Sequence, residues 1–183
     1  FFATSPFENA EETSNDAWKA LCTQIAEFNE ELRFTTILGF QWFANTAEEG
    51  LRQLLYFKDN KPILRKKDAK TNTLKKIYKG HSPKEILAIP SFTMAKGFQT
   101  TFEDFTPEFE RVVEIYNAWG SSECTAKEGN SRPITSNEKS GVFETEKGSI
   151  RKALNANCRF GFVAGGLDDD AVVSGLLYES PKI

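Results

Sequence analysis

The sequence predicts one α/β domain in which helices alternate with mainly parallel strands. The chain has 183 residues, of which 39% are hydrophobic and 27% charged, as is typical of a soluble globular domain with a core. Segments with apolar residues at helical spacing alternate with short runs rich in β-branched and aromatic residues. These runs are almost continuously apolar, which is typical of parallel strands covered by helices.

In the first part of the chain we expect one helix and two strands. Residues 15–31 carry apolar side chains at helical spacing, and the polar residues 13–16 offer N-cap oxygens and an early negative charge. Residues 33–43 are rich in β-branched and aromatic side chains and predict a strand. Residues 51–57 fit either a helix or a strand, and we favour the strand.

A basic, polar insert follows at residues 58–80, with a short helix expected from Leu74 to Tyr78. Residues 58–84 contain ten Lys and Arg but only two Asp, so this segment carries a formal charge of +8 in a chain whose net charge is −3. Such a segment is either an anion-binding surface or a solvated loop folded over the acidic remainder. The candidate anion-binding residues are Lys66, Lys67, Lys75 and Lys76.

The second part of the chain predicts the remaining elements. Three strands are expected at residues 86–93, 111–119 and 159–164. Helix starts are expected at residues 82–85 and 106–108, each with Pro at the first helical position, and at residues 148–156. Residues 120–147 form a long polar loop, and loops of that length are usually functional or mobile.

Polar residues follow four of the predicted strands and form a candidate site. The carboxyl ends of parallel strands lie on one side of an α/β sheet, so these side chains would meet there. The alternative is that each strand simply ends in a polar loop. The candidate pocket residues are Gln41, Ser91, Asn117, Ser121 and Ser122, beside Glu123 and the acidic run Asp168, Asp169 and Asp170.

Glu114 lies in the middle of a predicted strand. A carboxylate that points into a core needs a partner or a metal ion, whereas one that points outward would pair with a Lys or Arg.

Several site and protein classes are excluded by residue usage. Cys22, Cys124 and Cys158 are odd in number and widely spaced, which argues against a disulfide framework and a thiolate zinc site. His81 is the only histidine, which restricts zinc triads and histidine-based nucleophilic catalysis. There is no apolar run of transmembrane length and no signal peptide, so a soluble protein without membrane contact is expected. A pI of about 5.4 argues against a dedicated nucleic-acid binder.

Four segments, in order, resemble the PHP (polymerase and histidinol phosphatase) superfamily, and more closely an uncharacterised bacterial branch of it. They are T-I-L-G-F-Q-W, A-I-P-S-F-T, V-V-E-I-Y-N-A-W-G-S-S-E and A-L-N-A-N-C-R-F-G-F-V-A-G-G-L-D-D-D. The resemblance covers about residues 1–170 and rests on the order of the segments rather than on any one motif. It implies a distorted β/α barrel, and we expect this barrel to be incomplete in the present sequence, without the N-terminal strands of the full barrel.

The resemblance also implies two or three divalent metals and phosphoester hydrolysis, but most of the expected ligands are replaced. Gln41 stands where the family has Glu, and Ser91 and Phe92 stand where it has two His. Residues 1–6 lack the family's Asp-His ending, and Asp168–Asp170 lie near its Asp-x-His pair. Either the chain is a fragment, or this branch has lost the metal cluster.

Two functions follow. The first is a metal-dependent phosphoesterase relative with a degraded metal site, either still active or inactive as this chain. In it Asp168, Asp170 and Glu123 would act in catalysis, and Asp168, Asp169, Asp170 and Glu114 would bind metal. Oxygen ligands favour Mg²⁺, Mn²⁺ or Ca²⁺ over Zn²⁺, or no metal is bound. The second is a non-catalytic protein that uses residues 58–84 to bind an anionic small molecule or partner.

Overall fold

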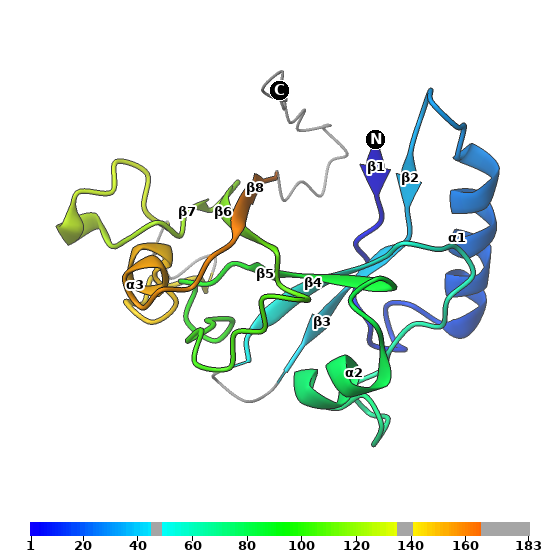
Figure 1. Cartoon of the computed structure of the whole chain (residues 1–183), viewed down its shortest axis with the longest axis horizontal. Helices are drawn as coiled ribbons and strands as arrows, with labels where there is room; N and C mark the ends of the chain where they lie inside the picture. Colours follow the sequence, from blue (N-terminus) through cyan, green and yellow to red (C-terminus); the bar gives the residue numbers. More distant parts are fainter. Residues whose placement is uncertain (45–48, 135–140, 166–183) are drawn as a thin grey trace.

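The computed structural model of the chain describes residues 1–44, 49–134 and 141–165. Its strands form three small sheets, ordered β1-β2, β3-β4-β5 and β7-β6-β8 (Figure 1). The elements are β1 (Phe2–Ala3), α1 (Asn15–Phe28), β2 (Thr36–Ile37), β3 (Gly39–Phe43), β4 (Leu51–Tyr56), α2 (Leu74–Gly80), β5 (Ile86–Ser91), β6 (Val112–Asn117), β7 (Gly120–Ser121), the 3₁₀ turn η1 (Ala126–Glu128), α3 (Ile150–Asn155) and β8 (Gly161–Ala164).

The central sheet is antiparallel. β4 pairs with β3 on one side and with β5 on the other, in continuous register from Leu51 to Tyr56. The main core packs α1 and α2 against this sheet, with Trp18 and Ile77 from the helices meeting Phe40 and Leu54 from the strands. A second core holds Leu51 at the start of β4, so β4 contributes to both.

The N-terminal unit is a β-α-β crossover. β1 and β2 run parallel, and α1 connects them (Figure 1). The Ser14 hydroxyl accepts a hydrogen bond from the backbone N–H of Ala17, which caps the first turn of α1 as the sequence predicts. The β1 chain continues beside β3, where Thr4 Oγ1 donates to the Gly39 carbonyl and accepts from the Gly39 N–H.

The C-terminal unit packs α3 beside β6 and β8 (Figure 1). β8 runs parallel to β6, whereas the short β7 is antiparallel to it. Ser149 caps α3 by accepting from the Lys152 N–H. Phe102, Val113 and Ile150 form the small core of this unit.

The predicted β/α barrel of mainly parallel strands is wrong. The described residues form three separate sheets with no closed barrel, and the largest of the strand pairings are antiparallel. Burial on both faces led to the error: β4 is buried along most of its length because it lies between two cores and between two neighbouring strands. An apolar run therefore shows that a strand is central, but not the direction of its neighbours.

Most element positions are confirmed, including the strand at residues 51–57 and the helix from Leu74. Residues 33–43 form two strands instead of one. The helix starts at residues 82–85 and 106–108 are wrong, because both segments form turns. At the first of them, Glu85 accepts from the Ser82 N–H as in a helix cap, but β5 begins at once at Ile86. Of the described helices, none is long and apolar enough to cross a bilayer.

Candidate ligand-binding site

Two of the predicted site residues meet on β6. Glu114 is partly buried, and its Oε2 accepts hydrogen bonds from the Asn117 side-chain amide and from the Phe92 backbone N–H, both at 3.1 Å. Burial raises the pKa of Glu114, and these two hydrogen bonds oppose that rise. The carboxylate thus has neutral partners, not the Lys or Arg predicted for an outward position.

The side chains of the other predicted pocket residues bond elsewhere. The Gln41 amide donates to the Ser5 backbone and hydroxyl oxygens on the N-terminal segment. Ser91 adjoins Phe92, but its hydroxyl donates to the Ile89 carbonyl of its own strand, and β4 lies between Ser91 and Gln41. Ser121 lies in β7, which pairs with β6, and its hydroxyl accepts from the Glu123 N–H; the Ser122 N–H donates to the Ile115 carbonyl.

The described residues do not fit the metal centre that the resemblance implies. No group of three His, Cys, Asp or Glu among them is placed to hold an ion. The Glu123 carboxylate is exposed and pairs with Arg151 at 2.8 Å, so it is directed to the surface. The acidic run Asp168, Asp169 and Asp170 lies outside the described residues.

The four lysines predicted to bind anions are separated by the structure. Lys66 and Lys67 line a cavity of about 820 Å³, whereas Lys75 lines another of about 450 Å³. The Lys76 ammonium donates to the Ala69 carbonyl and the Asn72 side chain, so it is already bonded to the loop that precedes α2. The basic segment therefore does not present one continuous anion-binding face.

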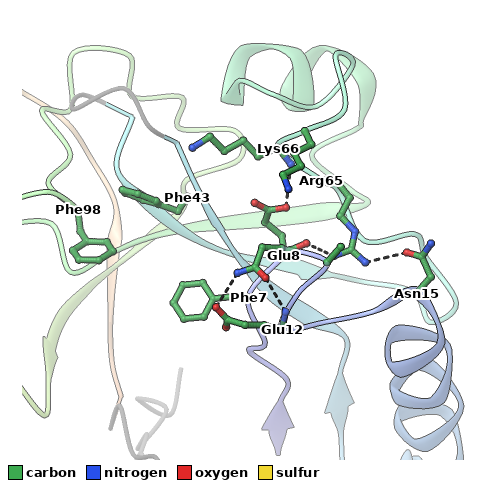
Figure 2. Close-up of a pocket in the computed structure, with 11 residues that line it drawn as sticks. Phe7, Glu8, Glu12, Asn15, Phe43, Arg65, Lys66 and Phe98 are labelled. Atoms are coloured by element: carbon green, nitrogen blue, oxygen red, sulfur yellow. Dashed lines mark hydrogen bonds between the residues drawn. The ribbon is translucent and has the colours of Figure 1, made fainter.

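The larger cavity has an apolar side and a charged side (Figure 2). The apolar side consists of Phe7 from the N-terminal segment, Phe43 from the end of β3 and Phe98 from the loop after β5. The Phe43 and Phe98 ring centroids lie 5.0 Å apart. On the charged side lie Lys66 and Arg65, and the Lys66 ammonium lies 5.5 Å from the centroid of the Phe43 ring.

Arg65 fixes the shape of the cavity. Its guanidinium donates to the backbone carbonyls of Glu8 and Thr13 and to the Asn15 side chain. The Lys66 backbone N–H donates to the Glu8 carboxylate. These bonds tie the segment before α1 to the basic segment, although the two are more than fifty residues apart in the chain.

Lys66 and Lys67 are the basic side chains of the cavity that could contact a bound anion. Arg65 is committed to the contacts above, and the Glu12 carboxylate accepts from the Asn9 amide. Neither Lys66 nor Lys67 forms an ion pair with any other described residue, and Lys67 is exposed. The lining side chains carry three positive and two negative formal charges, so the cavity is net positive by one.

The smaller cavity lies over a buried ion pair. Arg52 Nε donates to Glu110 Oε1 at 2.7 Å, with side chains 4% and 1% exposed. The Tyr78 hydroxyl donates to the same oxygen, and the Thr106 N–H donates to Oε2. Burial disfavours the charged guanidinium, but the Glu110 carboxylate outweighs this and the pKa of Arg52 is raised. Burial also raises the pKa of Tyr78 well above its usual value, so its hydroxyl stays protonated.

Comparison with curated proteins shows that the chain is similar to uncharacterized chlamydial proteins. It is 44% identical over 183 residues to an uncharacterized protein of Chlamydia pneumoniae, which covers 100% of this chain and 29% of that protein. It is 46% identical over 169 residues, or 92% of the chain, to uncharacterized proteins of Chlamydia trachomatis serovar D and Chlamydia muridarum, covering 27% of each. The chain thus spans less than a third of the length of these relatives. No family model and no solved structure matches it.

Only the charged side of the larger cavity could be predicted from the sequence. The density of positive charge indicated Lys66 and Lys67, but Phe7, Phe43 and Phe98 come from three separate segments and no spacing connects them. The signal for the buried pair was Arg52, the charged residue in the mostly apolar strand β4. Such a residue needs a partner of opposite charge, which is Glu110.

Proposed function

We propose that this domain is a non-catalytic binding module that holds a small amphipathic anion in the cavity between Phe7, Phe43 and Phe98 and the lysines Lys66 and Lys67. One observation carries the proposal: the Lys66 ammonium lies over the Phe43 ring inside a cavity with a phenyl wall, and it has no carboxylate partner among the described residues. The cavity volume of about 820 Å³ is in the range of small-molecule sites.

The two sides of the cavity require different parts of a ligand. Phenyl side chains stabilise an apolar group by removing its surface from water. Ammonium groups stabilise an anion through charge-assisted hydrogen bonds worth about 1.5–3 kcal/mol each. A ligand with one apolar part and one negative end matches both sides, whereas a cation would meet the net positive charge of the lining.

The metal-dependent phosphoesterase that the PHP resemblance implies stays a prediction. Its acidic residues at 168–170 lie outside the described residues, and Glu114 is held by neutral hydrogen-bond donors. We therefore derive no catalytic step for this chain.

Isothermal titration calorimetry with decanoate, 2-naphthoate and decyltrimethylammonium tests the proposal. At least one of the two carboxylates should bind to the 183-residue chain, and the cation should not. Binding should weaken as salt is added, because the headgroup contacts are partly exposed. A chain that binds neither carboxylate, or binds the cation equally well, contradicts the proposal.

A pair of matched variants separates the site from general charge. The double variant Lys66→Gln/Lys67→Gln should weaken carboxylate binding by about tenfold or more, as the loss of about 1.4 kcal/mol implies. Lys58→Gln/Lys79→Gln removes the same charge from exposed positions of the basic segment that do not line the cavity, and should leave binding nearly unchanged. Equal losses in both variants would show that only the net charge matters.

A further inference from the structure

Two of the three rings in the apolar wall, Phe43 and Phe98, belong to a packed aromatic cluster. The Phe43 and Phe98 rings are tilted by 44° with centroids 5.0 Å apart, and Phe98 also packs on Phe92 at 5.8 Å. Phe92 in turn packs on Trp119. Figure 2 shows Phe43 and Phe98 beside each other on one side of the cavity, with Phe7 nearby. Rings that already contact one another leave no gap between them.

This arrangement disfavours a planar aromatic ligand. Stacking between two phenyl rings needs room for a third ring, and Phe43 and Phe98 are too close to admit one. The Lys66 ammonium lies over the Phe43 ring at 5.5 Å and occupies that face. An anionic headgroup bound by Lys66 keeps the ammonium there, so the face stays covered when the ligand is bound.

A flexible alkyl chain has no such requirement. Its contacts are non-directional and depend only on the apolar area that is covered. It can follow the edges of tilted rings from Phe43 and Phe98 to Phe7, which is 37% exposed and offers open surface. The net charge of the lining, +1, is balanced by a single negative charge at the end of the chain.

We infer, building on the proposed function, that the ligand is an unbranched alkyl or acyl chain with one terminal anionic group. The chain lies on Phe7, Phe43 and Phe98, and the headgroup lies between Lys66 and Lys67. A carboxylate and a phosphate monoester share this chemistry. A carboxylate carries one charge at pH 7 and a phosphate monoester nearly two, so the phosphate gains more Coulomb energy from the lysines and loses more hydration on binding.

A chain-length series measured by calorimetry tests the inference. From hexanoate to octanoate to decanoate, affinity should rise about two- to fourfold for each added methylene, since full burial of a methylene corresponds to about fourfold. Decanoate should bind at least about tenfold more tightly than 2-naphthoate. Decyl phosphate identifies the headgroup: tighter binding than decanoate assigns a phosphate, weaker binding assigns a carboxylate, and binding of neither ligand overturns the inference.

The Phe7→Ser variant supplies a second test, because Phe7 is part of the apolar wall and is 37% exposed. Decanoate binding should weaken while hexanoate binding changes less, because the longer chain covers more of the wall. Equal weakening of both ligands would contradict an alkyl chain that lies along the wall.

The failures of the two proposals are distinguishable. Tighter binding of 2-naphthoate than of decanoate, or affinity independent of chain length, overturns the alkyl ligand while the lysine dependence still supports the binding function. Loss of all carboxylate binding, or binding indifferent to Lys66 and Lys67, overturns both.

Discussion

Removal of Glu110 and Arg52 together should cost clearly less stability than the two single removals added together. Glu110 and Arg52 are almost completely buried, so solvent screens neither charge. In the Glu110→Leu variant the Arg52 guanidinium keeps its charge and loses its carboxylate. Its remaining partners are the Thr100 hydroxyl and two backbone carbonyls, none of which is charged.

The magnitude follows from that uncompensated charge. Breaking a buried pair by removing one partner costs about 3–5 kcal/mol, whereas replacing both by apolar side chains is often close to neutral. Glu110→Leu also leaves the Tyr78 hydroxyl and the Thr106 N–H without their acceptor, at about 1–3 kcal/mol for each one that water does not reach. We expect each single variant, Glu110→Leu and Arg52→Met, to lose at least about 3 kcal/mol, and the double variant to lose clearly less than the sum.

Urea unfolding followed by tryptophan fluorescence measures these free energies, because Trp18 and Trp42 are buried in the main core. The same set of single and double variants at Glu30 and Arg33 is the control, since those charged groups lie 3.0 Å apart but the side chains are 55% and 83% exposed. It should show little coupling. Losses that add at positions 52 and 110 to within about 0.5 kcal/mol would refute the reasoning.

Two further predictions concern a buried acid and a glycine. Because burial raises the pKa of Glu114 in the folded chain, ionisation of Glu114 costs stability as the pH rises from the unfolded pKa of about 4.3 through the folded one. Glu114→Gln keeps an oxygen for both hydrogen bonds. In urea unfolding it should gain stability relative to the unchanged chain as the pH rises above the unfolded pKa of about 4.3, and a difference that does not change with pH would contradict this. Gly148→Ala should cost at least about 3 kcal/mol, because φ is +81° and the added Cβ would lie 1.8 Å from the Thr93 carbonyl oxygen. Gly97→Ala, at φ +93° with open space around the added Cβ, should cost only about 1–2 kcal/mol. Thermal unfolding of both variants measures these costs, and equal costs would show that the backbone conformation, not the close contact at Gly148, determines the loss of stability.

Local elements were predictable because their signals lie in consecutive residues. Ser14 and Ser149 are placed to cap their helices, and both do so in the structure. Strand direction was not predictable, because the apolar pattern of β4 is the same whichever way its neighbours run. The turn at residues 82–85 has the bonds of a helix start, but the next residue already pairs with β4, and tertiary pairing outweighed the local signal.

The candidate site was predictable only where charge was concentrated. Ten basic residues in one segment pointed to anion binding, but two of the four chosen lysines, Lys75 and Lys76, have other surroundings. The polar residues after the strands were expected to converge because a parallel sheet was assumed. β3 and β5 end at the same edge because both are antiparallel to β4, but β4 lies between Gln41 and Ser91. Each of these side chains bonds locally instead, Gln41 to Ser5 and Ser91 to Ile89.

The role of Arg65 explains why a charge-rich segment forms a defined cavity rather than a solvated loop. A lone exposed charge gains little from the protein, but this guanidinium satisfies two backbone carbonyls and one side chain of the segment before α1. Those bonds, together with the one from the Lys66 N–H to the Glu8 carboxylate, hold the segment that places Phe7 in the lining of the same cavity as Phe43. One basic residue holds the wall of the cavity together, and the two lysines that follow it are the ones that the proposed ligand would contact. On that proposal the charge of the segment has two separate physical roles, which composition alone does not distinguish.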